Sequence, residues 1–168
     1  MANTYTAIAT VTVGSGGAAN IEFTSIPATY TDLVVKLSLR TNFTGGVGDD
    51  LLLTINGSTA SFSNRYIYGN GSNTFSGTAY GNLVGTPVTT NATSNTFSNI
   101  EIYFPNYAGS TNKSYSVDSV SENNATEAYA FLIAGLRSNT DAITSLKFST
   151  SYTMQQYSTA TLYGIKNS

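Results

Sequence analysis

The sequence predicts an all-β fold, an antiparallel two-sheet sandwich of the jelly-roll type. The longest strand pattern runs from Tyr30 to Arg40, and its apolar side chains alternate along one face, namely Leu33, Val35, Leu37 and Leu39. About nine to ten short segments of this kind follow one another, separated by turn residues roughly every 8 to 20 positions. No segment has the period of an amphipathic helix. Because a strand with one apolar face needs a second layer to bury it, two packed sheets are expected.

Length and composition set the limits of this fold. The 168 residues suit one domain, residues 1–168, large enough to bury roughly 70% of the surface of its unfolded chain. Charged residues make up only 10% of the chain, whereas 12 Tyr and 8 Phe are too many for a disordered segment. We therefore expect a folded domain with a neutral surface of hydroxyl and amide groups.

The first two strands are expected over Tyr5–Val13 and Asn20–Ser25. In the first, the odd-numbered residues from Tyr5 to Val13 should share one face. The glycine-rich run Gly14–Gly17 that follows indicates a hairpin turn, because a phosphate-binding loop would need a following Lys and helix. Pro27 ends the second strand since proline cannot donate to a ladder.

The strand Tyr30–Arg40 is expected at the centre of the fold. Its apolar face should be fully buried against the second sheet, and its opposite face should be wet. That opposite face carries Asp32, Val34, Lys36, Ser38 and Arg40.

Two features surround the next strand, Leu51–Ile55. The loop Thr41–Asp50 ends in the pair Asp49-Asp50, which is either a solvated turn or part of a Ca²⁺ site, although the spacing of a calcium loop is missing. The dipeptide Asn56-Gly57 favours a primed hairpin turn.

The middle of the chain combines aromatic residues with an irregular region. A strand is expected over Ser61–Tyr68, where Arg65 either packs across strands or binds a ligand carboxylate. The region Gly69–Asn95 either forms functional loops or hides short strands, pinned by Phe75, Tyr80, Leu83 and Val88.

Five strands should complete the fold. Ser98–Phe104 points Ile100, Ile102 and Phe104 inward, and the next strand alternates through Tyr115, Val117 and Ser119. The run Ala128–Leu136 is apolar on both sides, which predicts a strand covered on both faces. The last two strands are expected over Ala142–Ser149 and Thr159–Lys166.

Composition also removes several classes of function. The chain has no His and no Cys, so Ser-His-Asp triads, thiolate nucleophiles and His- or Cys-bound metals are excluded, and no cofactor or metal is expected. A glycosidase needs two facing carboxylates, which the nine Asp and Glu leave open, but we expect no enzyme. A net charge of −2 and scattered cations argue against nucleic acid, and no apolar stretch is long enough to insert in a membrane.

Three segments carry a resemblance to a known family. FTSIPATYTDLVVKLS at 23–38, IYFPNYAGS at 102–110 and YSTATLYGIK at 157–166 resemble structural proteins of tailed bacteriophages, including cyanophages. The similarity extends over nearly the whole chain. It implies a virion protein, and it carries no catalytic or binding motif to particular residues.

The resemblance leaves two positions in the particle open. One is a capsid decoration or cement protein, a jelly roll on the outer shell that forms a homotrimer and clamps copies of the major capsid protein. The other is a receptor-binding or tail-fibre-tip module that recognises host surface glycans. A chain with its own start Met and no shaft repeat favours decoration, whereas loops rich in Tyr and Asn suit carbohydrate. We expect synthesis in the host cytoplasm and a final location in the virion.

Partner contact is expected in the irregular region, together with Thr41–Asp50. Loops carry recognition in most sandwiches, and no charged residue lies between Gly69 and Asn95. Contact should therefore depend on apolar and amide groups, for which the candidates are Phe75, Tyr80, Leu83, Asn82 and Asn91.

Overall fold

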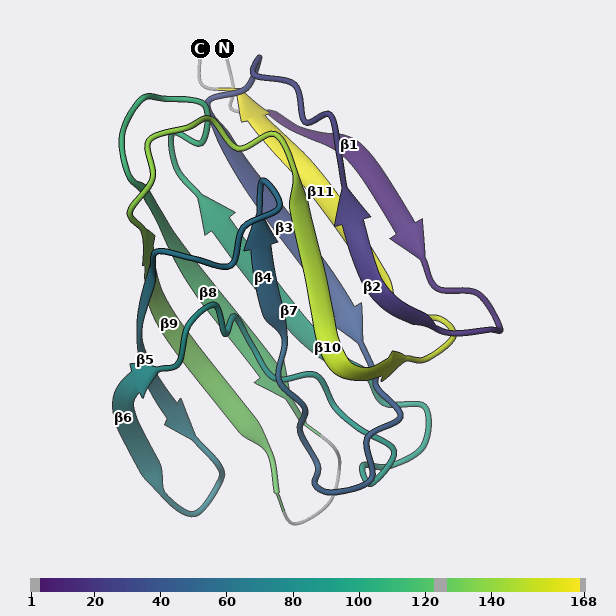
Figure 1. Cartoon of the computed structure of the whole chain (residues 1–168). Coiled ribbons are helices and arrows are strands. Elements are labelled where there is room, and N and C mark those ends of the chain that lie inside the picture. The colour runs from purple at the N-terminus through teal and green to yellow at the C-terminus, as the bar shows by residue number, and fades with distance from the viewer. Residues whose placement is uncertain (1–3, 123–126, 167–168) are drawn as a thin grey trace.

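The computed structural model describes residues 4–122 and 127–166, and over these the protein is an all-β sandwich. Eleven strands form one sheet of eight strands and one of three, and every named strand pair is antiparallel. The predicted two-sheet sandwich is confirmed (Figure 1). The jelly-roll subtype stays a prediction. No helix of the described residues is long and apolar enough to cross a membrane.

The two sheets differ in width. The large sheet has the spatial order β1 (Thr4–Thr12), β11 (Thr159–Lys166), β3 (Asp32–Leu39), β7 (Ser98–Phe104), β8 (Lys113–Ser121), β9 (Tyr129–Arg137), β5 (Phe62–Gly69) and β6 (Thr74–Ala79). The small sheet has the order β2 (Ala18–Phe23), β10 (Leu146–Met154) and β4 (Leu52–Ile55). In Figure 1 the small sheet lies in front of the middle of the large one, and β5 and β6 extend beyond it. The inner face of the large sheet is therefore left partly open at that side.

The core lies between the sheets and is centred on β3. Its four predicted inward residues are all buried, which confirms the predicted alternation: Leu33, Val35, Leu37 and Leu39. Leu37 lies opposite Ile100 of β7 and Ala160 of β11, so it is packed from both neighbouring strands. Ile21 and Phe23 of the small sheet belong to the same buried cluster.

The prediction that the other face of β3 is wet is wrong at three positions, Asp32, Val34 and Arg40, which are buried. Val34 lies between Tyr103 and Tyr163, its cross-strand partners, whose rings can cover it. The Asp32 carboxylate accepts hydrogen bonds from the Tyr103 hydroxyl at 2.9 Å and the Asn106 amide at 2.8 Å. Aromatic neighbours on adjacent strands, which a single strand pattern cannot reveal, bury this face.

A bulge corrects the predicted face of β1. The register of β1 against β11 shifts between Ala7 and Ala9. One extra residue reverses the side on which every later side chain lies. As a result Ile8 and Val11, which a regular strand would place on opposite faces, both pack against the core.

The Asn56-Gly57 turn forms as predicted, with φ of 51° and 74° at its two residues. Asn56 also fastens the segment before β10: its Nδ2 donates to the Ala142 carbonyl, and its Oδ1 accepts from the Thr144 and Ser145 amides. The tenth strand therefore begins at Leu146, later than the expected Ala142, and continues to Met154. A tertiary contact of one side chain sets this boundary.

The long region 69–95 contains a strand that the sequence pattern does not show, β6, which pairs with β5. Beyond it, the segment from Leu83 to Thr89 is buried, so Leu83 and Val88 pin the region as expected. The chain here runs beside the loop 41–50: the Thr41 amide donates to the Val88 carbonyl and the Asp49 amide to the Pro87 carbonyl. Much of this region therefore belongs to the framework.

The expectation that β9 is covered on both faces is wrong. Its inward residues Ile133, Gly135 and Arg137 are buried, whereas its outward residues are exposed in the isolated chain: Ala130, Leu132, Ala134 and Leu136. β9 lies in the eight-stranded sheet, and the second sheet packs on only one side of that sheet. The outer face of β9 is therefore apolar and uncovered in the isolated chain.

Candidate functional site

The most distinctive hollow lies on the inner face of the large sheet, where β5, β6 and β9 extend beyond the small sheet. We call it the aromatic pocket. Its volume is about 370 Å³, within the usual range for small-ligand sites. It is lined by Gly48, Asp50, Tyr66, Tyr68, Thr78, Ala79, Tyr80, Leu83, Thr86, Tyr129 and Phe131.

The aromatic rings of the pocket come from alternate positions of neighbouring strands. Tyr68 of β5 is the cross-strand partner of Phe75 on β6 and Phe131 on β9. Its ring stacks on both, with centroid distances of 4.7 Å to Phe75 and 4.5 Å to Phe131 and an interplanar angle of 20° in each pair. The three rings therefore stack face to face across three strands and together form one ring surface, which Tyr66 and Tyr129 contact at its edges.

A carboxylate faces this surface from the loop 41–50. The Tyr80 hydroxyl donates to Asp50 Oδ2, which joins the loop to the segment after β6. Burial, and then this hydrogen bond, raise the pKa of Tyr80, so its hydroxyl stays protonated at neutral pH. On the far side, burial and the hydrogen bond to Glu127 raise the pKa of Tyr129 to about 12. The lining contains no Lys or Arg, so the pocket carries negative charge.

The carboxylates of Asp49 and Asp50 do not lie together at one site. Asp49 is buried and its Oδ1 accepts from the Asp50 amide at 2.8 Å, while Asp50 is exposed and binds Tyr80. Burial raises the pKa of Asp49. Within the described part of the chain, no three His, Cys, Asp or Glu side chains lie together in a way that could hold a metal ion.

Three of the five predicted contact residues come together here. Tyr80 and Leu83 line the pocket, and Phe75 extends its ring surface through Tyr68. The other two hold the backbone: Asn82 Nδ2 donates to the Leu53 carbonyl at 2.6 Å, and Asn91 Nδ2 donates to the Thr44 carbonyl at 2.7 Å.

Sequence reasoning missed most of the ring surface. Tyr66 and Tyr68 are two positions apart on β5, as are Tyr129 and Phe131 on β9, so each pair shares one strand face. This alternation was a usable signal, but only the register of β5 against β9 brings the two pairs together. Arg65, which directly precedes Tyr66 on β5, points to the opposite face and is exposed.

The outer face of β5, β9 and β8 forms a second candidate surface, which we call the outer patch. It contains Ile67 of β5, Leu132 and Leu136 of β9, and Val120 of β8, all exposed aliphatic residues. Ile67 and Leu132 are direct cross-strand partners, so the patch is continuous at its centre. Arg65 and Asp118 border it on opposite sides, on β5 and β8.

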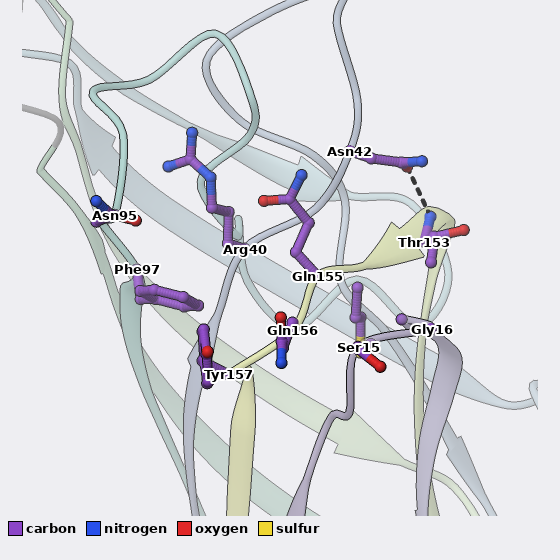
Figure 2. Close-up of a pocket in the computed structure, with 12 residues that line it drawn as sticks. Ser15, Gly16, Arg40, Asn42, Asn95, Phe97, Thr153, Gln155, Gln156 and Tyr157 are labelled. Carbon is purple, nitrogen blue, oxygen red and sulfur yellow. Dashed lines mark hydrogen bonds between the residues drawn. The ribbon is translucent and has the colours of Figure 1, made fainter.

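A second hollow, at one end of the sandwich, is polar (Figure 2). The β1–β2 turn, the end of β3 and the β10–β11 turn surround it, and the Thr153 amide donates to Asn42 Oδ1 at 2.9 Å. Its one charged lining residue is Arg40, which donates to the carbonyls of Ala92, Thr93 and Thr96. Because these bonds hold the neighbouring loop, Arg40 has a structural role here.

Comparisons with protein-family models, with curated proteins and with solved structures find no match for this chain.

Proposed function

We propose that the chain is a non-enzymatic structural protein of a tailed-bacteriophage virion, a jelly-roll decoration or cement protein on the outer shell. In this role it forms a homotrimer and clamps copies of the major capsid protein. The resemblance of three segments supports a virion protein. The observation that carries the assembly role is the outer patch, where Ile67 and Leu132 are each 61% exposed.

Keeping such an apolar surface exposed to water is unfavourable in free energy. A contiguous set of exposed aliphatic side chains on a rigid sheet face is typical of protein interaction sites. Burying an aliphatic side chain of this size contributes about 1.5–3 kcal/mol. A decoration protein covers its apolar face against the shell or against its own copies, and that cover would also account for the apolar outer side of β9.

The test is the number of copies per particle, followed by incorporation of variants. Hundreds of copies support the shell, and a few dozen or fewer contradict it. Leu132→Lys should abolish incorporation while the purified protein keeps its fold. Asn20→Lys, an exposed strand position on the small sheet, is the matched control and should incorporate normally.

A second function is favoured by the aromatic pocket: a receptor-binding or fibre-tip module that recognises host surface glycans. It predicts low copy number and location on the tail. Particles that carry the Tyr68→Thr protein at normal level but fail to adsorb to cells would support this second function over decoration.

A further inference from the structure

The strand β6 forms one edge of the large sheet, and its outer side is open (Figure 1). Only β5 pairs with it. At the tip of this hairpin the Asn70 amide donates to the Asn73 carbonyl at 3.1 Å. Because bonded and non-bonded pairs alternate from that point, Thr74, Ser76 and Thr78 direct their amides and carbonyls away from β5. Within the described part of the chain, these outward groups have no hydrogen-bond partner.

The edge at β6 lacks the features that usually stop an edge strand from pairing with another chain. Such features are charged side chains, proline and bulges. β6 has 6 residues in unbroken register with β5, and it contains neither a charged residue nor a proline. The opposite edge of the sheet, β1, is interrupted by the bulge between Ala7 and Ala9. β6 is therefore the edge to which a further strand can be added.

The side chains beside this edge define which strand fits. On the inner face, Tyr68 covers the ring of Phe75 on the side of β5, and Phe75 is still 42% exposed, so an apolar neighbour beside it would gain burial. On the outer face, the exposed Arg65 lies opposite Thr78 and forms no ion pair with another described residue. Its Nη1 donates to the carbonyl of Asn64, its neighbour in the strand, at 3.2 Å.

A carboxylate on the added strand would lie within reach of Arg65. Two strand spacings are about 10 Å, a distance that an Arg and a Glu side chain span together. Phe75 and Thr78 are three positions apart, so they lie on opposite faces of β6. An antiparallel strand therefore meets both groups when a carboxylate beside Thr78 comes three residues before an apolar side chain beside Phe75.

We propose that β6 is a docking edge for one extended, antiparallel strand of another protein, with a carboxylate three residues before an apolar side chain. Backbone bonds to Thr74, Ser76 and Thr78 supply affinity, and the contacts with Arg65 and Phe75 supply specificity. The source of this strand, a subunit of the shell, rests on the proposed decoration role. In that role the outer patch joins copies of the chain, and β6 holds the shell.

The experiment is an amide NMR titration of the full chain with two synthetic peptides. The probe is acetyl-Thr-Glu-Thr-Thr-Val-Thr-amide, which places Glu beside Thr78 and Val beside Phe75, and the control peptide has Lys in place of Glu. The probe should shift the amides of Thr74, Ser76 and Thr78, with a Kd on the order of 1 mM because a free peptide loses entropy on becoming extended. The Lys peptide should bind about fivefold more weakly, as expected for an exposed ion pair.

Three variants locate the site. Ser76→Pro removes one outward amide, leaves the ladder to β5 intact, and should weaken peptide binding at least about tenfold. On β1 the Val13 amide donates to the Ser158 carbonyl, so by the same alternation Thr10 directs its amide away from β11. Thr10→Pro is therefore the matched control and should leave binding unchanged. Arg65→Gln leaves the backbone unaltered and should abolish the preference for the Glu peptide.

Incorporation into particles tests the source of the strand. Ser76→Pro should lower the number of copies per particle at least about tenfold while the purified variant stays a homotrimer, and Thr10→Pro should incorporate normally. If Ser76→Pro instead dissociates the purified oligomer, a second copy occupies the edge and the proposal is wrong. Normal incorporation of Ser76→Pro would likewise overturn the shell as partner.

The peptide titration can overturn the docking edge on its own. No shift of the β6 amides, equal binding of the two peptides, or binding unaffected by Ser76→Pro would each do so. These results would leave the decoration role standing, because copy number and Leu132→Lys test that role separately. Conversely, peptide binding at β6 together with a low copy number of the wild type would leave the docking edge standing and contradict decoration.

Discussion

Ile67 of β5 and Leu132 of β9 lie directly opposite each other on the outer face of the large sheet, and each is 61% exposed. Cross-strand aliphatic pairs of this kind stabilise a sheet modestly, by about 0.2–1 kcal/mol. Most of their apolar surface nevertheless stays in water in the isolated chain. The pair is therefore the centre of the proposed interface.

Self-association is the first prediction from this pair. The purified chain should sediment as a homo-oligomer, a trimer, at micromolar concentration, and Leu132→Lys should shift it to monomer because a buried Lys would be unpaired. The free energy of unfolding of the monomeric Leu132→Lys variant should differ from that of the wild-type monomer by no more than about 0.5 kcal/mol, as at an ordinary surface site. A wild-type monomer, or an oligomer that survives Leu132→Lys, would contradict the outer patch as the interface between copies.

The second prediction concerns the centre of the core. Leu37 is buried between Ile100 and Ala160, so Leu37→Ala should lower the free energy of unfolding by about 2–5 kcal/mol through lost burial and a cavity. Denaturant unfolding measures it, with Ser116→Ala on an exposed position of β8 as the control. Equal midpoints for the two variants would refute the assigned core.

Gly135 of β9 provides a third test. A Cβ at this position would overlap the ring of Tyr115, its cross-strand partner on β8, so the glycine makes room for the ring. Gly135→Ala should therefore destabilise by about 1–3 kcal/mol, as overpacking does. Gly14→Ala is the control, since nothing lies within 4 Å of a Cβ there. Similar thermal midpoints for the two variants would show that the ring moves aside without cost.

The buried tyrosines predict loss of stability at high pH. Burial raises the pKa of Tyr115, and of Tyr107, above the ordinary value near 10. A phenol with a raised folded-state pKa ionises first in the unfolded chain. Its contribution to the free energy of unfolding is therefore complete below about pH 10 and is lost as pH rises through the folded-state pKa. Unfolding followed by circular dichroism from pH 8 to 12 should show this decline.

Tyr115→Phe provides the control for that decline. The Tyr115 hydroxyl donates to Asn64 Oδ1 at 2.6 Å, and Asn64 in turn donates to the Gly81 and Leu83 carbonyls. Its loss leaves a buried acceptor unpaired, which should cost about 1–3 kcal/mol at neutral pH. The variant should also lose less stability than the wild type between pH 8 and 12. An unchanged pH slope would mean that Tyr115 does not contribute to it.

The segments 23–38, 102–110 and 157–166 meet in the framework of the protein. The Tyr107 hydroxyl donates to the Pro27 carbonyl, and a Cβ at Gly164 would overlap the ring of Tyr30. These contacts join the loop before β3 to the loop after β7 and to β11. The residues of these segments thus hold the scaffold, and none of them lines the aromatic pocket.

Features that depend on local alternation along the chain could be predicted from the amino-acid pattern. The period of two gave the strand class, the four buried residues Leu33, Val35, Leu37 and Leu39, and the inward faces of β7 and β8. The Asn56-Gly57 turn likewise follows from local backbone preference. These features depend on neighbours along the chain, so a pattern can reveal them.

The positions of the candidate surfaces depend on pairing between distant strands, so only the three-dimensional structure reveals them. The order of the large sheet placed Tyr68 between Phe75 and Phe131, and the smaller width of the second sheet left these rings open. The same order left Ile67 beside Leu132 on the outer face, although the run around Leu132 reads as covered on both sides. Register and sheet width arise from contacts across the whole chain, and no stretch of sequence contains them.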